Sequence, residues 1–197
     1  MPVKGNAGVQ SPYRALAIAA MSLSLVLTLT GFQIWGAAPG YKLIGGVYGR
    51  YYWLDGSIGT TLASDIYSAK WSWGNATTTV AWAKTTTKAN SVLEWYQSSQ
   101  PATDLGYFGV AIFYLNGGLT SPIGYAPSSN YDKTKILLSS DVYSMNSQGI
   151  LVHEMGHVMG LAHSGAGATA VMRSDIANLG YTVPKSDDVN GINWLYP

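Results

Sequence analysis

The sequence predicts an α+β fold, because strand-like segments come first and helical segments are concentrated late in the chain. Two observations indicate that most of the chain forms a single domain. Apolar and aromatic residues make up 47% of the 197 residues, which is enough for a sizeable core. No internal repeat or long linker interrupts the sequence, so residues 41–197 are expected to fold together.

Five segments read as strands. Each combines β-branched or aromatic residues with flanking residues that favour turns, and the turn Asn116-Gly117-Gly118 follows the fourth of them. The predicted strands cover 50–54, 80–84, 92–97, 109–115 and 134–138.

Three segments read as helices. The first begins with Thr60 or Thr61 as its cap and runs to about Trp73. The second spans 147–160. The third begins with Ser186 as its cap, because a serine side chain can accept a hydrogen bond from the first helical turn.

The composition excludes several classes of function. The chain contains no cysteine, so disulfides, thiolate zinc clusters and a cysteine nucleophile are all excluded. A metal site would have to use histidine, carboxylate, carbonyl or water ligands. The formal net charge is +1 and no basic stripe is visible, so no nucleic-acid partner is expected.

The first 40 residues have the parts of a secretory signal peptide. Lys4 and Arg14 precede an apolar run over 15–29, and small residues follow at 36–38. The run is shorter than the roughly 20 residues that span a bilayer. An uncleaved membrane anchor extended through Phe32 is the alternative. Either interpretation divides the chain into an export segment, 1–40, and an exported domain, 41–197.

The sequence HEMGHVMGLAH at 153–163 holds every histidine of the chain. His153 and His157 are four residues apart, so on a helix they share one face and can hold a single zinc ion. Glu154 is placed to act on a water beside that ion. Gly160 can end the helix, and His163 can then return as a third ligand. Three protein ligands leave a fourth position open, which is typical of catalytic zinc.

The extended pattern is that of the metzincin zinc proteases, in which a methionine turn lies beneath the metal. Met172 matches that methionine. Within this clan the chain resembles the matrixins, the matrix-metalloprotease family. The resemblance is carried by His163-Ser164 and by the segments 187–192 and 195–196, which are similar to the last matrixin helix.

The resemblance implies a twisted mixed sheet of five strands with three helices and a zinc site in a cleft. It implies that Gly109–Phe113 is the edge strand to which substrate adds as an extra strand. Substrate-binding residues are then expected on that strand and in the segment between Met172 and Pro184. The candidates are Gly109, Val110, Ala111, Ile176, Leu179 and Tyr181.

The resemblance also implies one catalytic zinc ion as cofactor. Asp55, Asp104, Asp132 and Asp141 are scattered, so calcium stays possible but unsupported. No histidine remains for the second, structural zinc that many matrixins hold. Latency through a propeptide cysteine is likewise not expected.

The expected function is a secreted, monomeric zinc endopeptidase in which Glu154 is the general base and a peptide or protein is the substrate. Two alternatives stay open. One is a zinc-binding interaction module without catalytic activity. The other is a membrane-tethered processing protease with one dedicated substrate, which would contact the membrane only through an uncleaved N-terminal segment.

Overall fold

The structure is a computed structural model that describes residues 40–197. The predicted export segment lies outside the described residues except for its last one, Gly40, so that prediction stays untested. Among residues 40–197, no helix combines the length and the apolar run needed to cross a membrane.

The described residues form an α+β domain with a six-stranded mixed sheet, which confirms the predicted fold class. The strand order is β2-β1-β3-β6-β4-β5. The first four strands in this order run parallel, whereas β4 runs antiparallel to both β6 and β5. The strands are β1 (Arg50–Leu54), β2 (Trp82–Lys84), β3 (Leu93–Gln97), β4 (Gly109–Leu115), β5 (Gly118–Leu119) and β6 (Lys133–Leu138).

All five predicted strands are present, with ends that shift by no more than two residues. The sheet has a sixth strand, β5, that the sequence analysis did not predict. It consists of Gly118 and Leu119, which pair with Leu115 and Tyr114 across the predicted turn. Two residues are too few to show the alternation that reveals a strand in a sequence.

Residues 40–197 contain four α-helices where three were predicted: α2 (Thr60–Ala76), α3 (Ala102–Leu105), α4 (Ser147–Val158) and α5 (Ser186–Leu195). The unpredicted α3 is a single turn. The predicted caps were wrong, because Gly59 precedes α2 and Lys185 precedes α5. At α5 the capping group is the carboxylate of Asp188, which accepts the backbone N–H of Lys185 at 2.7 Å.

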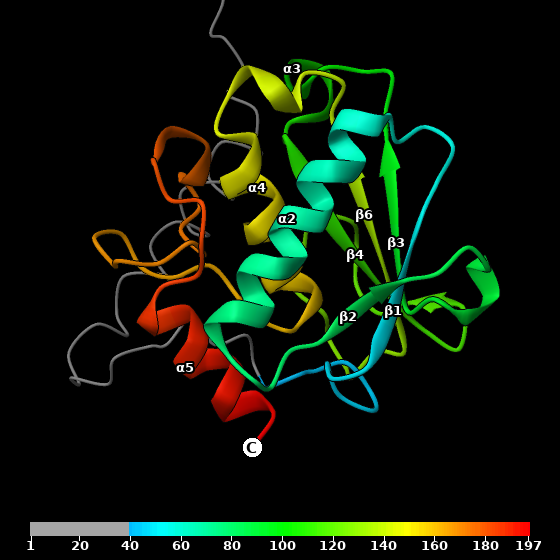
Figure 1. The fold of residues 1–197 in the computed structure, drawn as a ribbon, viewed down its shortest axis with the longest axis vertical. Helices are drawn as coiled ribbons and strands as arrows, with labels where there is room; N and C mark the ends of the chain where they lie inside the picture. Colours follow the sequence, from blue (N-terminus) through cyan, green and yellow to red (C-terminus); the bar gives the residue numbers. More distant parts are fainter. Residues whose placement is uncertain (1–39) are drawn as a thin grey trace, which may run out of the picture. The chain divides into compact units, whose positions relative to one another are not determined.

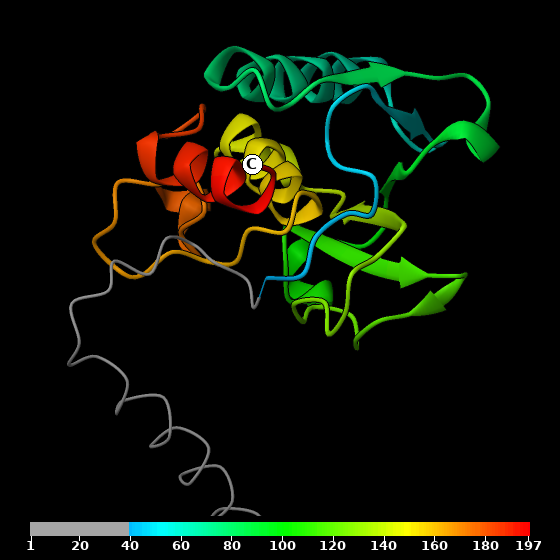
Figure 2. The ribbon, with the colours of Figure 1, turned by 90° about the horizontal axis from the view of Figure 1, so that it is seen from below.

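Helices α2 and α4 pack against each other on one side of the sheet (Figures 1 and 2). The core between these layers includes the fully buried Trp73 of α2 and Trp95 of β3. The indole N–H of Trp73 donates to the carbonyl of Val152 at 2.9 Å. This bond fixes α2 against the middle of α4, the helix that carries the histidine motif.

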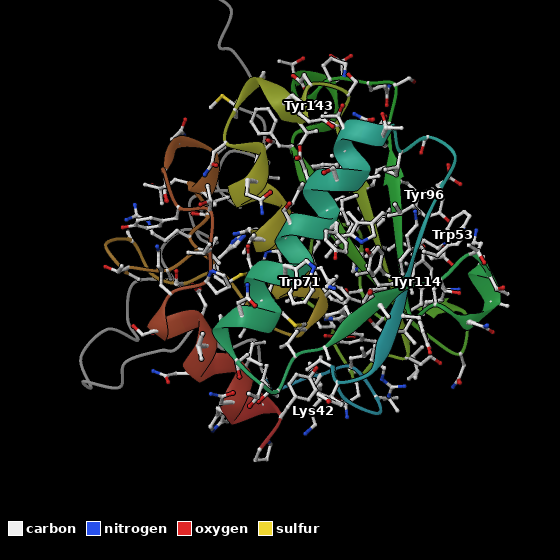
Figure 3. The ribbon with its side chains drawn as sticks, in the orientation of Figure 1. Lys42, Trp53, Trp71, Tyr96, Tyr114 and Tyr143 are labelled. Carbon is white, nitrogen blue, oxygen red and sulfur yellow. The ribbon has the colours of Figure 1, made fainter. Side chains whose placement is uncertain are left out.

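The opposite face of the sheet carries interleaved aromatic rings and lysines. The ammonium of Lys88 lies 4.9 Å from the Trp53 ring centre and 5.4 Å from that of Tyr96. The ammonium of Lys135 lies 4.7 Å from the Tyr114 ring centre, and the three rings come from β1, β3 and β4 (Figure 3). Cation–π contacts of this kind let an uncovered sheet face carry large aromatic side chains.

Part of β4 presents an open edge. β6 pairs with Gly109–Tyr114 on one side, whereas β5 covers only Tyr114 and Leu115 on the other. Within residues 40–197, no strand pairs with the segment 109–112 on the side away from β6. Strand β4 is therefore not the last strand of the sheet, but its first half is free to accept a further strand.

Candidate metal centre

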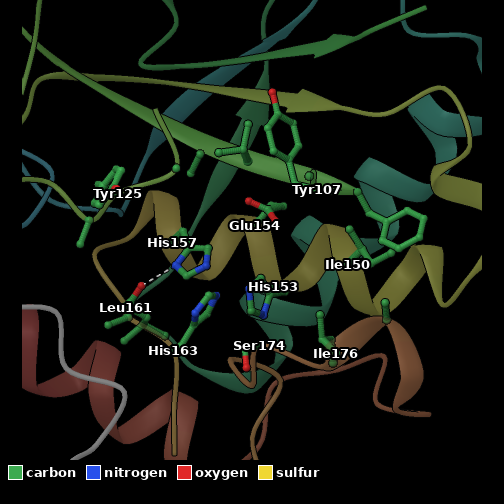
Figure 4. Close-up of a pocket in the computed structure, with 18 of the residues that line it drawn as sticks. Tyr107, Tyr125, Ile150, His153, Glu154, His157, Leu161, His163, Ser174 and Ile176 are labelled. Carbon is green, nitrogen blue, oxygen red and sulfur yellow. Dashed lines mark hydrogen bonds between the residues drawn. The ribbon is translucent and has the colours of Figure 1, made fainter. Parts of the chain in front are cut away.

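Helix α4 and the turn after it bring the three histidines together (Figure 4). His153 and His157 lie one turn apart on the helix. The helix ends before Gly160, whose φ of 96° is rarely adopted by other residues, and the chain then returns past His163. One nitrogen from each histidine lies within 4.8 Å of those of the other two. This spacing allows one ion to contact all three rings after small side-chain adjustments.

Backbone carbonyls select the tautomer of two of these rings. Nδ1 of His153 lies 2.8 Å from the carbonyl oxygen of Val171, and Nδ1 of His157 lies 2.7 Å from that of Leu161. A carbonyl can only accept, so each Nδ1 carries the proton and each Nε2 keeps a free lone pair. Metal-binding histidines in proteins are usually oriented in this way.

The surroundings also keep these rings neutral. Burial lowers the pKa of His153 to about 4, and burial together with the neighbouring histidines lowers the pKa of His157 well below its usual value. Zinc binds only the neutral imidazole. The three histidines therefore fit a zinc ion in charge state and spacing, and His153 and His157 also fit it in tautomer.

The carboxyl group of Glu154 is buried beside the histidines and only 5% of the residue is exposed. Its Oε2 has no hydrogen-bond partner among the described residues, and burial raises the pKa of Glu154 to about 8. A Cβ at position 109 would lie only 2.8 to 3.0 Å from the Glu154 side chain. Because Gly109 has no side chain, the start of β4 leaves room for the carboxyl group of Glu154.

Among residues 40–197, the three histidines are the only group of at least three histidine or acidic side chains placed to hold a metal ion. Among the acidic residues considered for calcium, two accept hydrogen bonds from backbone N–H groups near helix or turn ends. Asp55 accepts the N–H of Ser57, and Asp141 accepts that of Ala102. Calcium binding therefore has no support in the described residues.

The sequence profile of a known family, described as Matrixin, matches residues 68–197. The chain belongs to the matrixin family. A search of curated proteins found no significant match. The family match covers the second half of α2, the whole site and the last helix, and it supports a metzincin zinc-protease fold for this chain.

In this matrixin the last helix holds the segment around Met172, which the sequence analysis matched to the methionine turn. The carboxylate of Asp188 accepts the N–H of Val171 at 2.8 Å and the N–H of Met172 at 3.1 Å, in addition to that of Lys185. The carbonyl of Met172 in turn accepts the N–H of Ser164, next to His163. Asp188 thus links α5 to the carbonyl that orients His153.

A cleft of about 810 Å³ opens beside the histidines. Of the predicted substrate-binding residues, Gly109, Val110, Ala111 and Ile176 line it. Leu179 and Tyr181 do not, and their carbonyl oxygens instead accept hydrogen bonds from the side chain of Asn146.

Sequence reasoning missed several residues of the cleft and its support. Tyr107 and Tyr125 lie at the cleft, and Ala177 and Asn178 continue the wall begun by Ile176 (Figure 4). These four residues lie in turn segments next to β4 and Met172, and that position was the clue to them that the sequence offered. Asn146 carried no such signal, because its contacts to the wall span more than 30 residues of sequence.

Proposed function

We propose that this matrixin is a zinc-dependent endopeptidase. The observation that carries the proposal is the convergence of three histidines, two of them fixed through Nδ1 by backbone carbonyls, on a site beside the buried carboxyl group of Glu154. The open edge of β4 runs along the same cleft and supports a substrate in extended form.

A zinc ion held by His153, His157 and His163 would polarise the scissile carbonyl and acidify a water molecule. Glu154 acts as the general base that takes a proton from the attacking water, and it then passes that proton to the leaving amine. The substrate backbone lies along residues 109–112, which fix its register through backbone hydrogen bonds. The apolar wall at Ile150 and Ile176 receives a substrate side chain next to the cut.

The proposal is tested by comparing the zinc-loaded protein with Glu154→Gln on a mixed peptide library read by mass spectrometry. Both proteins should hold one zinc ion, and only the parent should cut. Activity of the Gln variant near that of the parent would disprove the role of Glu154. Bound zinc without any cleavage by the parent would favour the interaction module or an enzyme with one dedicated substrate.

We further propose that the protein is exported, on the basis of the charged, apolar and small-residue pattern of residues 1–40. Sequencing the N-terminus of the protein from the outside of the cell tests this. A new N-terminus near position 40 indicates a free, secreted enzyme. An intact N-terminus in the membrane fraction indicates the tethered form.

A further inference from the structure

Asn146 stands at the N-terminus of α4, one turn before the cleft residue Ile150. Its Oδ1 accepts the N–H of Gly149 at 3.2 Å, so the side chain caps the helix that carries the zinc ligands. Capping uses only the oxygen of the amide, and the two N–H groups of Nδ2 remain to bind elsewhere.

Those N–H groups point at the segment Ile176–Tyr181, defined here as the wall loop. Nδ2 of Asn146 lies 2.9 Å from the carbonyl oxygen of Tyr181, 3.4 Å from that of Ile176, and closest to that of Leu179. The backbone N–H of Asn146 also donates to the carbonyl of Ala177 at 3.5 Å. One residue therefore binds carbonyls along most of the wall loop.

Gly149 provides a second, independent sign that the wall loop is pressed against α4. A Cβ on this residue would lie 2.4 Å from the carbonyl oxygen of Tyr181 and 2.1 Å from Nδ2 of Asn146. Glycine costs a helix about 1 kcal/mol relative to alanine. Its presence in the first turn of α4 is explained by this close approach.

The wall loop and α4 form two sides of the same pocket. Ile176 and Ala177 of the loop line the cleft together with Ile150 of α4 (Figure 4). Ile150 follows Asn146 by one helical turn, and its backbone N–H donates to the carbonyl of Asn146. The distance between the two apolar sides therefore depends on the bonds that Asn146 makes to both elements.

We propose that Asn146 is a specificity-determining positioning residue, whose side-chain amide ties the wall loop to the first turn of α4 and so sets the width of the pocket for the substrate side chain next to the cut. The proposal rests on the proposed endopeptidase function. Asn146 lines no part of the cleft and acts only through the residues that it holds.

The substitution Asn146→Asp separates capping from the tie to the wall loop. Aspartate caps helices as well as asparagine does, and its charge suits the helix N-terminus. Where asparagine has two N–H donors, however, aspartate has a second oxygen. This oxygen would face three carbonyl oxygens and be repelled by them. The variant should fold and hold one zinc ion, while amide hydrogen exchange over residues 176–181 should rise by about tenfold or more.

The catalytic readout uses full-length, zinc-loaded protein and a peptide series that varies only the residue after the cut, from alanine through leucine to phenylalanine. The parent should discriminate strongly among them. In Asn146→Asp the ratio of the best to the worst kcat/KM should shrink about tenfold, mainly through KM. Asn190→Asp, the same chemical change on an exposed position of α5, should leave both exchange and selectivity unchanged.

Unchanged exchange and unchanged selectivity in Asn146→Asp would overturn the proposal. If Asn146→Asp does not fold, Gly149→Ala provides the test, because its Cβ pushes apart the Asn146 amide and the Tyr181 carbonyl, and it must alter the same selectivity. A parent that cuts no peptide would count against a general endopeptidase, separately from the role of Asn146. Exchange over residues 176–181 would then decide the role of Asn146 in holding the wall loop.

Discussion

At the scale of single residues, the metal centre holds groups whose pKa values shift in opposite directions. Burial lowers the pKa of His153 to about 4, so the stability that this residue contributes is present above pH 6.5 and is lost as the pH falls toward 4. Burial raises the pKa of Glu154 to about 8, so its contribution is present below pH 4.5 and is lost as the pH rises toward 8.

We therefore predict that the metal-free protein is most stable near pH 6.5. From pH 6.5 to 8 its free energy of unfolding should fall by about 2 kcal/mol, because Glu154 is ionised in the unfolded state but still holds its proton in the folded state. Glu154→Gln should abolish this loss, and added zinc should reduce it, because a nearby cation favours the ionised carboxylate. Urea unfolding at a series of pH values measures the effect, and a parallel decline in the Gln variant would contradict it.

A second prediction at this scale concerns Asp188, which is buried and accepts three backbone N–H groups. Asp188→Asn turns an amide NH₂ group toward those donors. The free energy of unfolding should fall by about 2–4 kcal/mol, and zinc affinity should fall about tenfold or more because Val171 orients His153.

The matched control is Asp187→Asn, since no hydrogen bond from the neighbouring Asp187 side chain is present among the described residues. Denaturant unfolding and zinc competition with a chelator measure the two effects. Equal losses in both variants would show that charge, rather than the bonds of Asp188, is responsible.

At the scale of elements, α4 is fastened at both ends by side chains from distant parts of the chain. Asn146 binds its first turn to the wall loop. At the other end, the hydroxyl of the buried Tyr131 donates to the carbonyl of Val158 at 2.8 Å, and that of Tyr196 donates to the carbonyl of Met159 at 3.0 Å. These carbonyls have no partner within the helix, so the tyrosines satisfy groups that would otherwise be buried unpaired.

Tyr131→Phe should accordingly lower the free energy of unfolding by about 1–2 kcal/mol, because it removes the donor and leaves the Val158 carbonyl buried. The corresponding fall in the thermal midpoint is about 2–8 °C for a domain of this size. Calorimetry of the metal-free protein is the measurement. Tyr48→Phe, at an exposed position, serves as control, and an equal change there would rule out the hydrogen bond as the cause.

The same elements show what the sequence could predict. Helix α2 was recognisable because Leu62, Ile66, Ala69 and Trp73 recur on one face and are buried in the core. The three histidines were recognisable as candidate metal ligands because their pattern is local. Strand β5 and helix α3 were too short to show any period. The bonds from Asn146 to the wall loop and from Asp188 to Val171 and Met172 join residues too far apart in sequence for a local pattern to reveal them.

At the scale of the whole molecule, the sheet face opposite the helices depends on one buried acid. Glu94 of β3 is fully buried, and it binds Lys133, Lys88 and the hydroxyl of Tyr96. Burial raises the pKa of Glu94, but the bonds from Lys133 and Tyr96 and the charges of the two lysines outweigh it, so the pKa lies below its usual value. Glu94 therefore stabilises the fold above its ordinary pKa and ceases to do so as the pH falls.

Glu94→Gln leaves both lysines without their counter-charge. Because these lysines are partly exposed, the expected loss of unfolding free energy is about 1–2 kcal/mol rather than the larger cost of breaking a fully buried pair. Thermal melts at pH 7 and at pH 3 measure it, and the difference from the parent should shrink at pH 3. A difference that persists in acid would show that packing, not charge, explains the effect.

If substrate adds to the open edge at residues 109–112 as proposed, the backbone groups of that edge would recognise an extended shape without regard to side-chain identity. Only a segment that can straighten beside this edge has its own N–H and C=O groups available, since those of a helix or an inner strand are already paired. The open edge would therefore select a target segment by whether it is unfolded, rather than by its amino-acid composition. We expect linkers, loops and loosened termini of other proteins to be cut, while the folded interiors of the same proteins stay intact.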